Sequence, residues 1–274
     1  MSYININGQL LPETEAKISV KDRSFRFGDS VFETLTFRNQ RLYRWDMHKT
    51  RLERGLSALK IGFDTVILER EILRTLTSNN LINGSARLTV TRGEGSRGYL
   101  PTESCKPNFV IEAMNELHME RTTANLCISK YKKIPAECLP VDCKISQGLN
   151  QTLAKIEARD KGYFEALQLN MAGEIAEGAS SNIFFVKGGK IFTPSLDCGI
   201  LNGITRQLVL QLSPHKITEG HFTPNDLKTA DEIFITNTTI KLLFVDEVEG
   251  IFRSNGNHKI SQEIKTFLEE DTKK

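Results

Sequence analysis

The sequence predicts a mixed α/β fold with α+β character, in which most neighbouring strands are antiparallel. Two observations support this prediction. Short runs of alternating apolar and polar residues recur along the chain, and a few amphipathic helices lie between them. The helices do not follow the strands one by one, so a doubly wound parallel sheet is not expected. With 274 residues, 39% of them hydrophobic, the chain can bury one large core or two smaller ones.

The N-terminal half opens with a predicted hairpin over residues 3–10, because the dipeptide Asn7-Gly8 favours a two-residue turn. The other expected elements of this half are a strand at 31–37 that turns at Asn39-Gln40 into 41–43, a helix from its cap Asp46 to Lys60, a helix near 64–76, and strands at 85–92 and 108–113 around a glycine-rich loop.

A polar stretch at 119–123 separates the two halves, and the strand pattern restarts at Ala124. The sequence therefore predicts domains at 1–117 and 124–274 with a linker at 118–123. The expected elements of the second half are strands at 124–128, 165–169, 181–186, 190–193 and 232–236 and helices at 151–161, from Asn202 onward and at 260–270.

Composition narrows the class of protein. A net charge of +2 gives no basic field that would suit nucleic acid. The first residues lack the basic start and apolar core of a signal peptide, and no apolar run is long enough to span a bilayer. The five cysteines are odd in number and never form a CxxC pair, which favours reduced thiols in the cytoplasm over disulfides or a metal site.

One lysine and one glutamate are candidates for chemistry. Lys144 stands between Cys143 and Ile145, just before an expected helix. Burial and the positive field of a helix N-terminus both disfavour an ammonium ion, so Lys144 is a candidate for a nucleophilic amine. Glu177 follows thirty-three residues later in Glu177-Gly178-Ala179-Ser180-Ser181-Asn182. It either caps the next strand or serves as a buried acid.

Three other segments suit a phosphate group. Asn202-Gly203-Ile204-Thr205-Arg206 opens an apolar helix whose first N–H groups are free for an anion, and Thr205 adds a hydroxyl donor. Arg51 is either an exposed charge or a bidentate phosphate ligand. The run Thr236-Asn237-Thr238-Thr239 supplies further short donors.

An amine, a carboxylic acid and a phosphate cradle are together what pyridoxal 5′-phosphate requires. The amine holds the cofactor aldehyde as a Schiff base, and the acid keeps the ring nitrogen protonated. The sequence therefore predicts this cofactor and no metal.

These motifs resemble the class IV aminotransferase family, which includes branched-chain aminotransferases, D-amino-acid transaminases and 4-amino-4-deoxychorismate lyase. The likeness runs from Val20-Lys21-Asp22-Arg23 and Phe27-Gly28-Asp29 to Gly203-Ile204-Thr205-Arg206. It implies a two-domain type IV fold, with an N-terminal α/β sandwich, a C-terminal pseudo-barrel and the cofactor between them. It also implies a homodimer that completes the pocket.

The resemblance assigns roles to single residues. It implies that Lys144 forms the Schiff base and that Glu177 contacts the ring nitrogen. The other implied cofactor residues are Arg51, Ile204, Thr205, Asn237 and Thr238 at the phosphate and Leu201 against the ring.

The substrate is to be read from the N-terminal half. The loop from Arg92 to Tyr99 is similar to the arginine-glycine loop of the lyases, whose substrate carries two carboxylates, and Thr34 stands where a lyase threonine assists the reaction. D-amino-acid transaminases usually have an Arg-x-His pair where Arg97 and Tyr99 stand, and a tyrosine at Phe32. Branched-chain aminotransferases usually have a tyrosine at the position of Leu149.

These comparisons favour a lyase that converts 4-amino-4-deoxychorismate to 4-aminobenzoate and pyruvate in folate biosynthesis, with Lys144 and Thr34 as catalytic residues. Arg97, Tyr99 and Phe32 are the expected substrate-binding residues. The alternative is a transaminase of D-amino acids or branched-chain amino acids. Either enzyme is expected to be a cytoplasmic homodimer with a small anionic substrate and no nucleic-acid or membrane partner.

Overall fold

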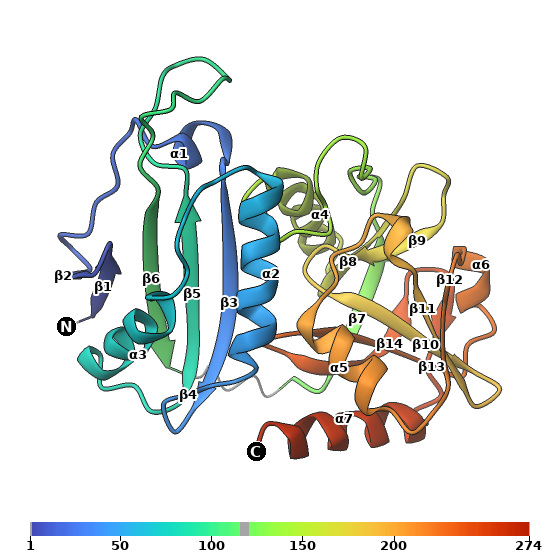
Figure 1. Cartoon of the computed structure of the whole chain (residues 1–274). Helices are drawn as coiled ribbons and strands as arrows, with labels where there is room; N and C mark the ends of the chain where they lie inside the picture. The colour runs from blue at the N-terminus through green and yellow to red at the C-terminus, as the bar shows by residue number, and fades with distance from the viewer. Residues whose placement is uncertain (1, 116–120, 274) are drawn as a thin grey trace. The chain divides into compact units, whose positions relative to one another are not determined.

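The structure is a computed structural model that describes residues 2–115 and 121–273. It divides the chain into two compact units (Figure 1). Unit 1 comprises residues 1–118 and 143–147, and unit 2 comprises residues 119–142 and 148–274. The segment 143–147, which the sequence assigned to the second domain, thus lies with the first. The expected linker at 118–123 falls partly outside the described residues.

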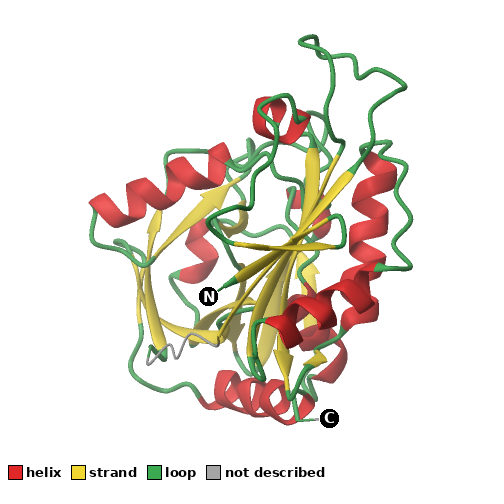
Figure 2. Ribbon diagram, turned by 90° about the vertical axis from the view of Figure 1, so that its left-hand side faces the viewer, coloured by secondary structure: helices red, strands yellow, loops and turns green. Residues whose placement is uncertain are grey.

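Unit 1 is a six-stranded antiparallel sheet in the order β2-β1-β6-β5-β3-β4, with helices α2 and α3 packed on one face (Figures 1 and 2). Its elements are β1 (Tyr3–Ile6), β2 (Gln9–Pro12), α1 (Arg23–Phe27), β3 (Ser30–Arg38), β4 (Arg41–Leu42), α2 (Trp45–Ala58), α3 (Leu68–Ser78), β5 (Gly84–Thr91) and β6 (Asn108–Asn115). Both predicted hairpin turns are present: Asn7 and Gly8, and Asn39 and Gln40, all have positive φ.

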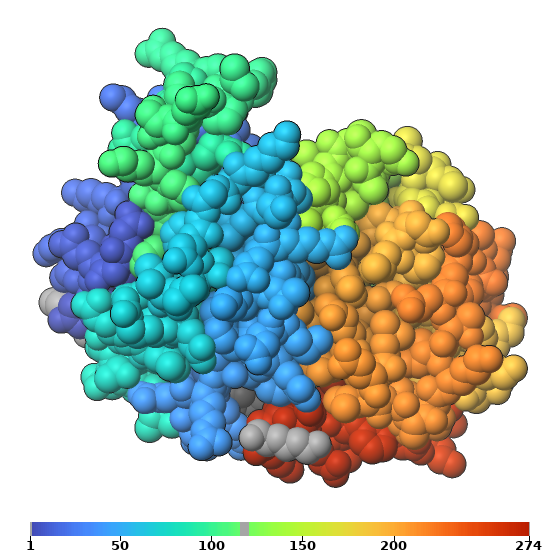
Figure 3. All heavy atoms as spheres, viewed as in Figure 1, coloured from blue at the N-terminus to red at the C-terminus, as the bar shows by residue number. Residues whose placement is uncertain are grey.

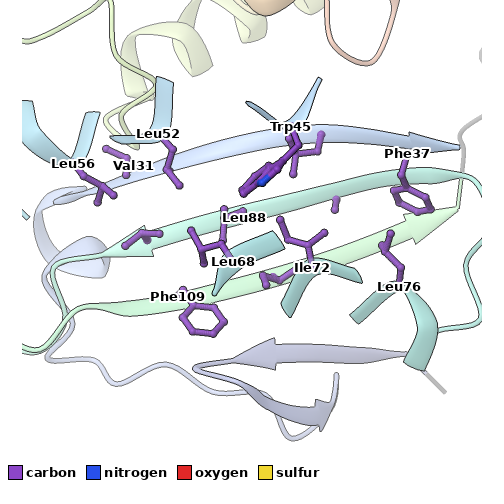
Figure 4. Packing of buried hydrophobic residues seen from close by; sticks show 14 of the residues in the cluster. Val31, Phe37, Trp45, Leu52, Leu56, Leu68, Ile72, Leu76, Leu88 and Phe109 are labelled. Carbon is purple, nitrogen blue, oxygen red and sulfur yellow. The ribbon is translucent and has the colours of Figure 1, made fainter. Parts of the chain in front are cut away.

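The core of unit 1 lies between the sheet and its two helices (Figure 4). Strand alternation turns Val31, Leu35 and Phe37 of β3 toward the helices, where they are buried. Helix α3 presents Leu68, Ile72 and Leu76 to the same core. The residues of β3 that alternate with these three point to the opposite face of the sheet.

The predicted cap of α2 is wrong by two residues. The helix begins at Trp45, and Arg44, at φ 54°, occupies the cap position but makes no side-chain capping bond to the helix. Only two residues separate β4 from the helix, so the chain has to reverse in a tight left-handed turn there. Asp46 lies in the first helical turn, where its charge still faces the positive end of the helix.

Unit 2 is a nine-stranded mixed sheet. Eight strands follow the order β12-β11-β10-β13-β14-β7-β8-β9, and β15 pairs with β14. Strand β9 also lies against β10 and β11, so the sheet curls back on itself as the pseudo-barrel expectation requires. Its elements are β7 (Thr123–Ile128), α4 (Leu149–Asp160), β8 (Glu165–Leu169), β9 (Ile175–Gly178), β10 (Asn182–Lys187), β11 (Lys190–Pro194), η1 (Leu196–Cys198), α5 (Ile204–Leu212), β12 (Ile217–Gly220), α6 (Pro224–Leu227), β13 (Glu232–Asn237), β14 (Lys241–Val248), β15 (Phe252–Arg253) and α7 (Lys259–Asp271).

Several strands of unit 2 were not predicted from the sequence. Strand β9 lies where the sequence suggested a turn, and all four of its residues are buried. Strand β14 was also missed, although it pairs with β13 and β7 in the middle of the sheet. No helix in the described parts of the chain combines the length and the apolar character that crossing a bilayer demands.

Candidate active site

Strand β3 positions Lys144. The N–H of Phe32 donates to the carbonyl of Lys144 at 2.9 Å, and the N–H of Ser146 donates to the carbonyl of Ser30 at 3.0 Å. The segment 143–147 is therefore held along β3 by backbone bonds inside unit 1. This pairing places the Lys144 Nζ 4.5 Å from the centroid of the Phe32 ring.

A second cation reaches the same ring. Arg87 on β5 lies opposite Thr34 on β3, and its guanidinium carbon is 3.9 Å from the Phe32 centroid. Partial desolvation lowers the pKa of Arg87, against the opposing charge of Glu112, although its side chain remains exposed. Arg87 was not predicted as a site residue, although the strand pattern carries a signal: alternation in β5 buries Ala86 and Leu88 and turns Arg87 to the other face.

Arg51 is buried in unit 1, not exposed on its helix. Its Nε donates to Oε1 of Glu33 at 2.8 Å and its Nη2 donates to Oε2 at 2.6 Å, a bidentate pair. Burial alone would raise the pKa of Glu33, but Arg51 and then His48 lower it to about 2. Glu33 is thus a fixed anion that orients Arg51.

His48 completes this cluster. Its Nδ1 lies 2.7 Å from Oε2 of Glu33, and burial lowers its pKa. The neutral imidazole therefore donates from Nδ1 to the carboxylate. Its Nε2 is buried and has no hydrogen-bond partner among the described residues.

Glu177 lies near the end of strand β9 in unit 2 and is 5% exposed. Three donors hold its carboxylate. Lys133 Nζ lies 2.5 Å from Oε1, while the Asn182 amide at 2.9 Å and the Leu201 N–H at 3.1 Å donate to Oε2. Lys133 carried no distinguishing pattern in the sequence, so only the structure identifies it.

Asn182 joins Glu177 to the start of helix α5. Its amide donates both to Glu177 and to the Leu201 carbonyl, at 2.9 Å each. Its Oδ1 lies so close to Gly203 that a Cβ there would meet it at 2.2 Å. Gly203 caps α5 without a side-chain hydrogen bond, and Ile204 and Thr205 follow, both buried. Glycine is therefore required at this helix start by a close approach.

The turn after β13 is tied to the same region of unit 2. The amide of Asn237 donates to the Ser180 carbonyl at 2.9 Å, and its Oδ1 accepts the N–H groups of Thr239 and Ile240. The strand that carries Glu177 leads directly to Ser180. The structure thus brings Asn237 and Thr238 to the segment that follows Glu177. The sequence alone did not establish this proximity.

The predicted site residues divide between the two units. Lys144, Arg51, Phe32 and Thr34 lie in unit 1, and the remaining predicted cofactor residues lie in unit 2. Arg97 and Tyr99 lie on the loop 92–107, which projects from unit 1 (Figures 1 and 3). Both are exposed, and Tyr99 contacts Phe27 at 5.4 Å between ring centroids.

Each unit offers buried polar atoms that suit contact with pyridoxal phosphate. Three buried atoms, His48 Nε2, Ser146 Oγ and Thr236 Oγ1, have no hydrogen-bond partner in the described structure. Ser146 is two residues from Lys144, and Thr236 directly precedes Asn237. Buried polar atoms are normally satisfied, so these positions suit contact with a polar group or with water. The uncapped glycine start of α5 suits an anion.

Comparison with known proteins gives a consistent result. The family model described as amino-transferase class IV matches residues 30–248. A putative branched-chain-amino-acid aminotransferase of Methanocaldococcus jannaschii is 34% identical, with 97% of this chain and 94% of that protein covered. A D-alanine aminotransferase of Listeria innocua is 30% identical, with 97% and 94% covered.

Solved structures agree with the sequence comparison. A branched-chain amino acid aminotransferase of T.th., solved with pyridoxamine 5′-phosphate, superimposes with a TM-score of 0.92 at 27% identity, covering 99% of this chain and 94% of that one. The Escherichia coli branched-chain enzyme gives 0.91 at 25% identity, with 97% and 92% covered. The chain therefore belongs to the class IV aminotransferases, has their type IV fold and is a pyridoxal phosphate-dependent enzyme.

Proposed function

We propose that the protein is a transaminase that moves an amino group between an amino acid and a 2-oxo acid. The observation that carries the proposal is the position of two cations on one aromatic ring: Lys144 Nζ and the Arg87 guanidinium both lie over Phe32, at 4.5 and 3.9 Å from its centroid. An amine for proton transfer and a guanidinium that can bind a carboxylate thus both contact the Phe32 ring. Amino acids and 2-oxo acids carry a carboxylate next to the reacting carbon.

Each residue has a definite task in this reaction. Bound pyridoxal phosphate supplies an electron sink for the substrate's α-carbon. Lys144 Nζ takes the proton from that carbon and returns it during transfer of the amino group. Glu177 would keep a proton on the ring nitrogen of the bound cofactor, and Arg51 and the N–H groups at the start of α5 would be donors to its phosphate.

The names of the relatives support an amino-acid substrate. The Methanocaldococcus jannaschii protein is named for branched-chain amino acids and the Listeria innocua protein for D-alanine. Phe32 gives the face of the unit 1 sheet opposite the helices an apolar side chain that suits a small aliphatic substrate. Arg87 suits the carboxylate that amino acids and an amino acceptor such as 2-oxoglutarate both carry next to the reacting carbon. We therefore propose a branched-chain or D-amino acid as donor and 2-oxoglutarate as acceptor.

The lyase remains a second candidate because of Thr34. Strand register places Thr34 directly opposite Arg87, and alternation puts it on the same face of the sheet as Phe32. A hydroxyl beside a carboxylate-binding cation suits proton donation to a departing enolpyruvyl group. The arginine-glycine loop that carries Arg97 and Tyr99 also matches this activity, which would yield 4-aminobenzoate and pyruvate.

Parallel assays separate the two candidates. The purified holoenzyme is supplied with D-alanine, L-leucine or L-valine together with 2-oxoglutarate, and glutamate is measured by chirality-resolved chromatography. A second reaction contains 4-amino-4-deoxychorismate, and 4-aminobenzoate is measured. Glutamate formation without 4-aminobenzoate supports the transaminase, whereas 4-aminobenzoate without glutamate formation replaces it with the lyase.

Two variants test the residue assignments. Lys144→Ala is expected to abolish either activity and to remove the cofactor absorbance that borohydride bleaches; retained activity would mean that another lysine reacts. Arg87→Met is expected to raise KM for 2-oxoglutarate about tenfold or more, because a charge-assisted hydrogen bond is lost. Arg38→Met, an exposed arginine at the end of β3, is the matched control and leaves KM unchanged.

We also propose a homodimer in the cytoplasm. Helix α1 and the loop 92–107 are joined by Arg23, whose guanidinium donates to the carbonyls of Gly98 and Tyr99. Phe25 and Leu100 in these segments are 76% and 84% exposed, an apolar surface that a second copy can cover. All five cysteines are free thiols, which suits a reducing compartment. Light scattering of the holoenzyme tests the dimer, and a monomer at micromolar concentration contradicts it.

A further inference from the structure

A separate group of side chains in unit 2 has metal-ligand chemistry. Glu174 directly precedes β9, Cys198 ends η1 and His221 follows β12. One donor atom from each lies within 4.8 Å of the other two. Three segments distant in sequence thus converge on one point, and none of these three residues belongs to the predicted cofactor set.

The distances approach those of a tetrahedral zinc site. With Zn–S near 2.3 Å and Zn–N and Zn–O near 2.0 Å, a tetrahedron separates sulfur from nitrogen by about 3.5 Å and nitrogen from oxygen by about 3.3 Å. Cys198 Sγ lies 3.8 Å from His221 Nδ1, and Glu174 Oε2 lies 2.9 Å from the same nitrogen. Small side-chain adjustments would therefore seat an ion among the three atoms.

The surrounding contacts orient the ligands. His221 Nε2 lies 3.0 Å from Oδ2 of Asp197, and the hydroxyl of Ser195 donates to the other oxygen of Asp197. A carboxylate on the remaining nitrogen of a histidine is the usual support of a metal-binding imidazole. Asn170 similarly donates to Oε2 of Glu174 at 2.7 Å and fixes that carboxylate.

We propose that Glu174, Cys198 and His221 bind a zinc ion, with water as the fourth ligand. A thiolate, an imidazole and a carboxylate together select Zn²⁺ over Mg²⁺ or Ca²⁺, which prefer oxygen ligands. The His221 side chain is 48% exposed, so water reaches the fourth position. The sequence predicted no metal because the ligands are 24 and 23 residues apart and show no CxxC or similar spacing.

The protons released on zinc binding depend on the protonation of Cys198 and His221 before the ion binds. Burial raises the pKa of the Cys198 thiol, and hydrogen bonds to Glu174 and then Asp197 raise the pKa of His221. Binding of Zn²⁺ forms the Zn–S bond and releases the thiol proton to solvent. The protonated imidazole releases its Nδ1 proton and keeps the one on Nε2, which it donates to Asp197.

The ion links the two segments that flank the cofactor acid. Glu174 lies three residues before Glu177, and Cys198 lies three residues before Leu201, whose N–H donates to Glu177. Zinc therefore joins these segments near the hydrogen bond between Leu201 and Glu177. Its role is structural support, and its binding is independent of which substrate the enzyme takes.

Cobalt substitution tests the site. The holoenzyme is treated with a chelator and dialysed, then titrated with Co²⁺ and separately with Zn²⁺ by calorimetry. We expect one ion per chain and, for Co²⁺, an ultraviolet thiolate-to-cobalt charge-transfer band in the difference spectrum. Cys198→Ser is expected to remove the band, and Asp197→Asn is expected to weaken binding about ten- to hundredfold.

Matched variants control for other thiols and histidines. Cys127→Ser removes another buried thiol of unit 2, and His215→Gln removes another histidine paired with a carboxylate, Glu263. Neither is expected to change the band or the affinity. Circular dichroism confirms that each variant is folded, and Asp197, exposed on the surface, provides a variant that does not disturb the core.

Three results overturn the proposal. Absence of the charge-transfer band with Co²⁺ in excess means that the cluster is an ion-pair network only. A band that persists in Cys198→Ser, or that is lost equally in Cys127→Ser, assigns the metal to another thiol. Unchanged affinity in His221→Gln, with folded protein, removes the histidine from the site.

Discussion

The two units each bury a glutamate beside a cation, but they hold it differently. In unit 1, Glu33 receives two parallel bonds from Arg51 and a third contact from His48. In unit 2, Glu177 receives one bond each from Lys133, Asn182 and the backbone of Leu201. The planar guanidinium fixes both oxygens of Glu33, whereas the Lys133 ammonium is a point charge on a flexible chain.

This difference suits a structural role for Glu33 and, under the proposed function, a cofactor-binding role for Glu177. Glu33 has both oxygens occupied by rigid donors and serves to aim Arg51. Glu177 receives two neutral donors at Oε2 and the Lys133 ammonium at Oε1. We infer that the Lys133 contact exchanges with the cofactor, while the Arg51 contact does not.

The largest loss of stability is expected from Arg51→Met. Removing one partner of a buried ion pair leaves an uncompensated charge and costs about 3–5 kcal/mol. The upper end of this range is expected because Glu33 loses both hydrogen bonds from Arg51 at once. Trp45, the only tryptophan of the chain, lies in the unit 1 core, so its fluorescence during urea unfolding reports this unit. A loss below about 1 kcal/mol would show that Arg51 does not fix Glu33.

Acid is expected to destabilise unit 1 through Glu33. Its pKa is about 2 in the folded protein against 4.5 for the ordinary group. The resulting stabilisation is complete above pH 4.5 and is lost as the pH falls toward 2, a total of about 3 kcal/mol. His48 also lowers the free energy of unfolding on acidification, and its effect begins at a higher pH than that of Glu33, because its pKa is lowered from 6.5 in the folded protein. Urea unfolding at a series of pH values measures the slope.

The variant Glu33→Gln is the control for this slope. It lacks the titrating carboxyl, so the dependence of its unfolding free energy on pH between 4.5 and 2 should be shallower than that of the wild type. An identical slope in both proteins would assign the acid sensitivity to other carboxyl groups.

A smaller loss is expected from Lys133→Met in unit 2. The cost lies near the lower end of the range for a broken buried pair, about 3 kcal/mol, because Asn182 and Leu201 continue to donate to Glu177. Hydrogen exchange of β9 and β10 amides measures it locally. The cofactor-free protein should lose more protection than the holoenzyme if the cofactor replaces Lys133. Equal losses in both forms would contradict that exchange.

The smallest effect is expected at the surface. Lys161 contacts Glu249 at 3.1 Å and Glu157 at 3.4 Å, but its side chain is 37% exposed. Solvent screens such pairs, so Lys161→Gln should cost less than about 1 kcal/mol in thermal unfolding followed by circular dichroism. A loss comparable with that of Lys133→Met would mean that burial does not explain the ranking.

Local patterns were sufficient for most elements of the fold. Both hairpin turns of unit 1 could be predicted because the tendency toward positive φ is a property of the turn residues themselves. The strand at 165–169 could be predicted because its apolar residues are clustered in the sequence. Strand β9 was not predicted because its four residues show no alternation between a buried and an exposed face. All four are buried.

The cofactor and the family could be predicted from local motifs, since Lys144, Glu177 and the glycine start of α5 occur in the order that the family resemblance implies. The side chains that surround these residues could not be predicted in this way. Lys133 lies 44 residues from Glu177, and Arg87 reaches Phe32 from another strand. Such contacts depend on strand register and packing between distant segments, which no local pattern encodes. The three proposed zinc ligands come together for the same reason.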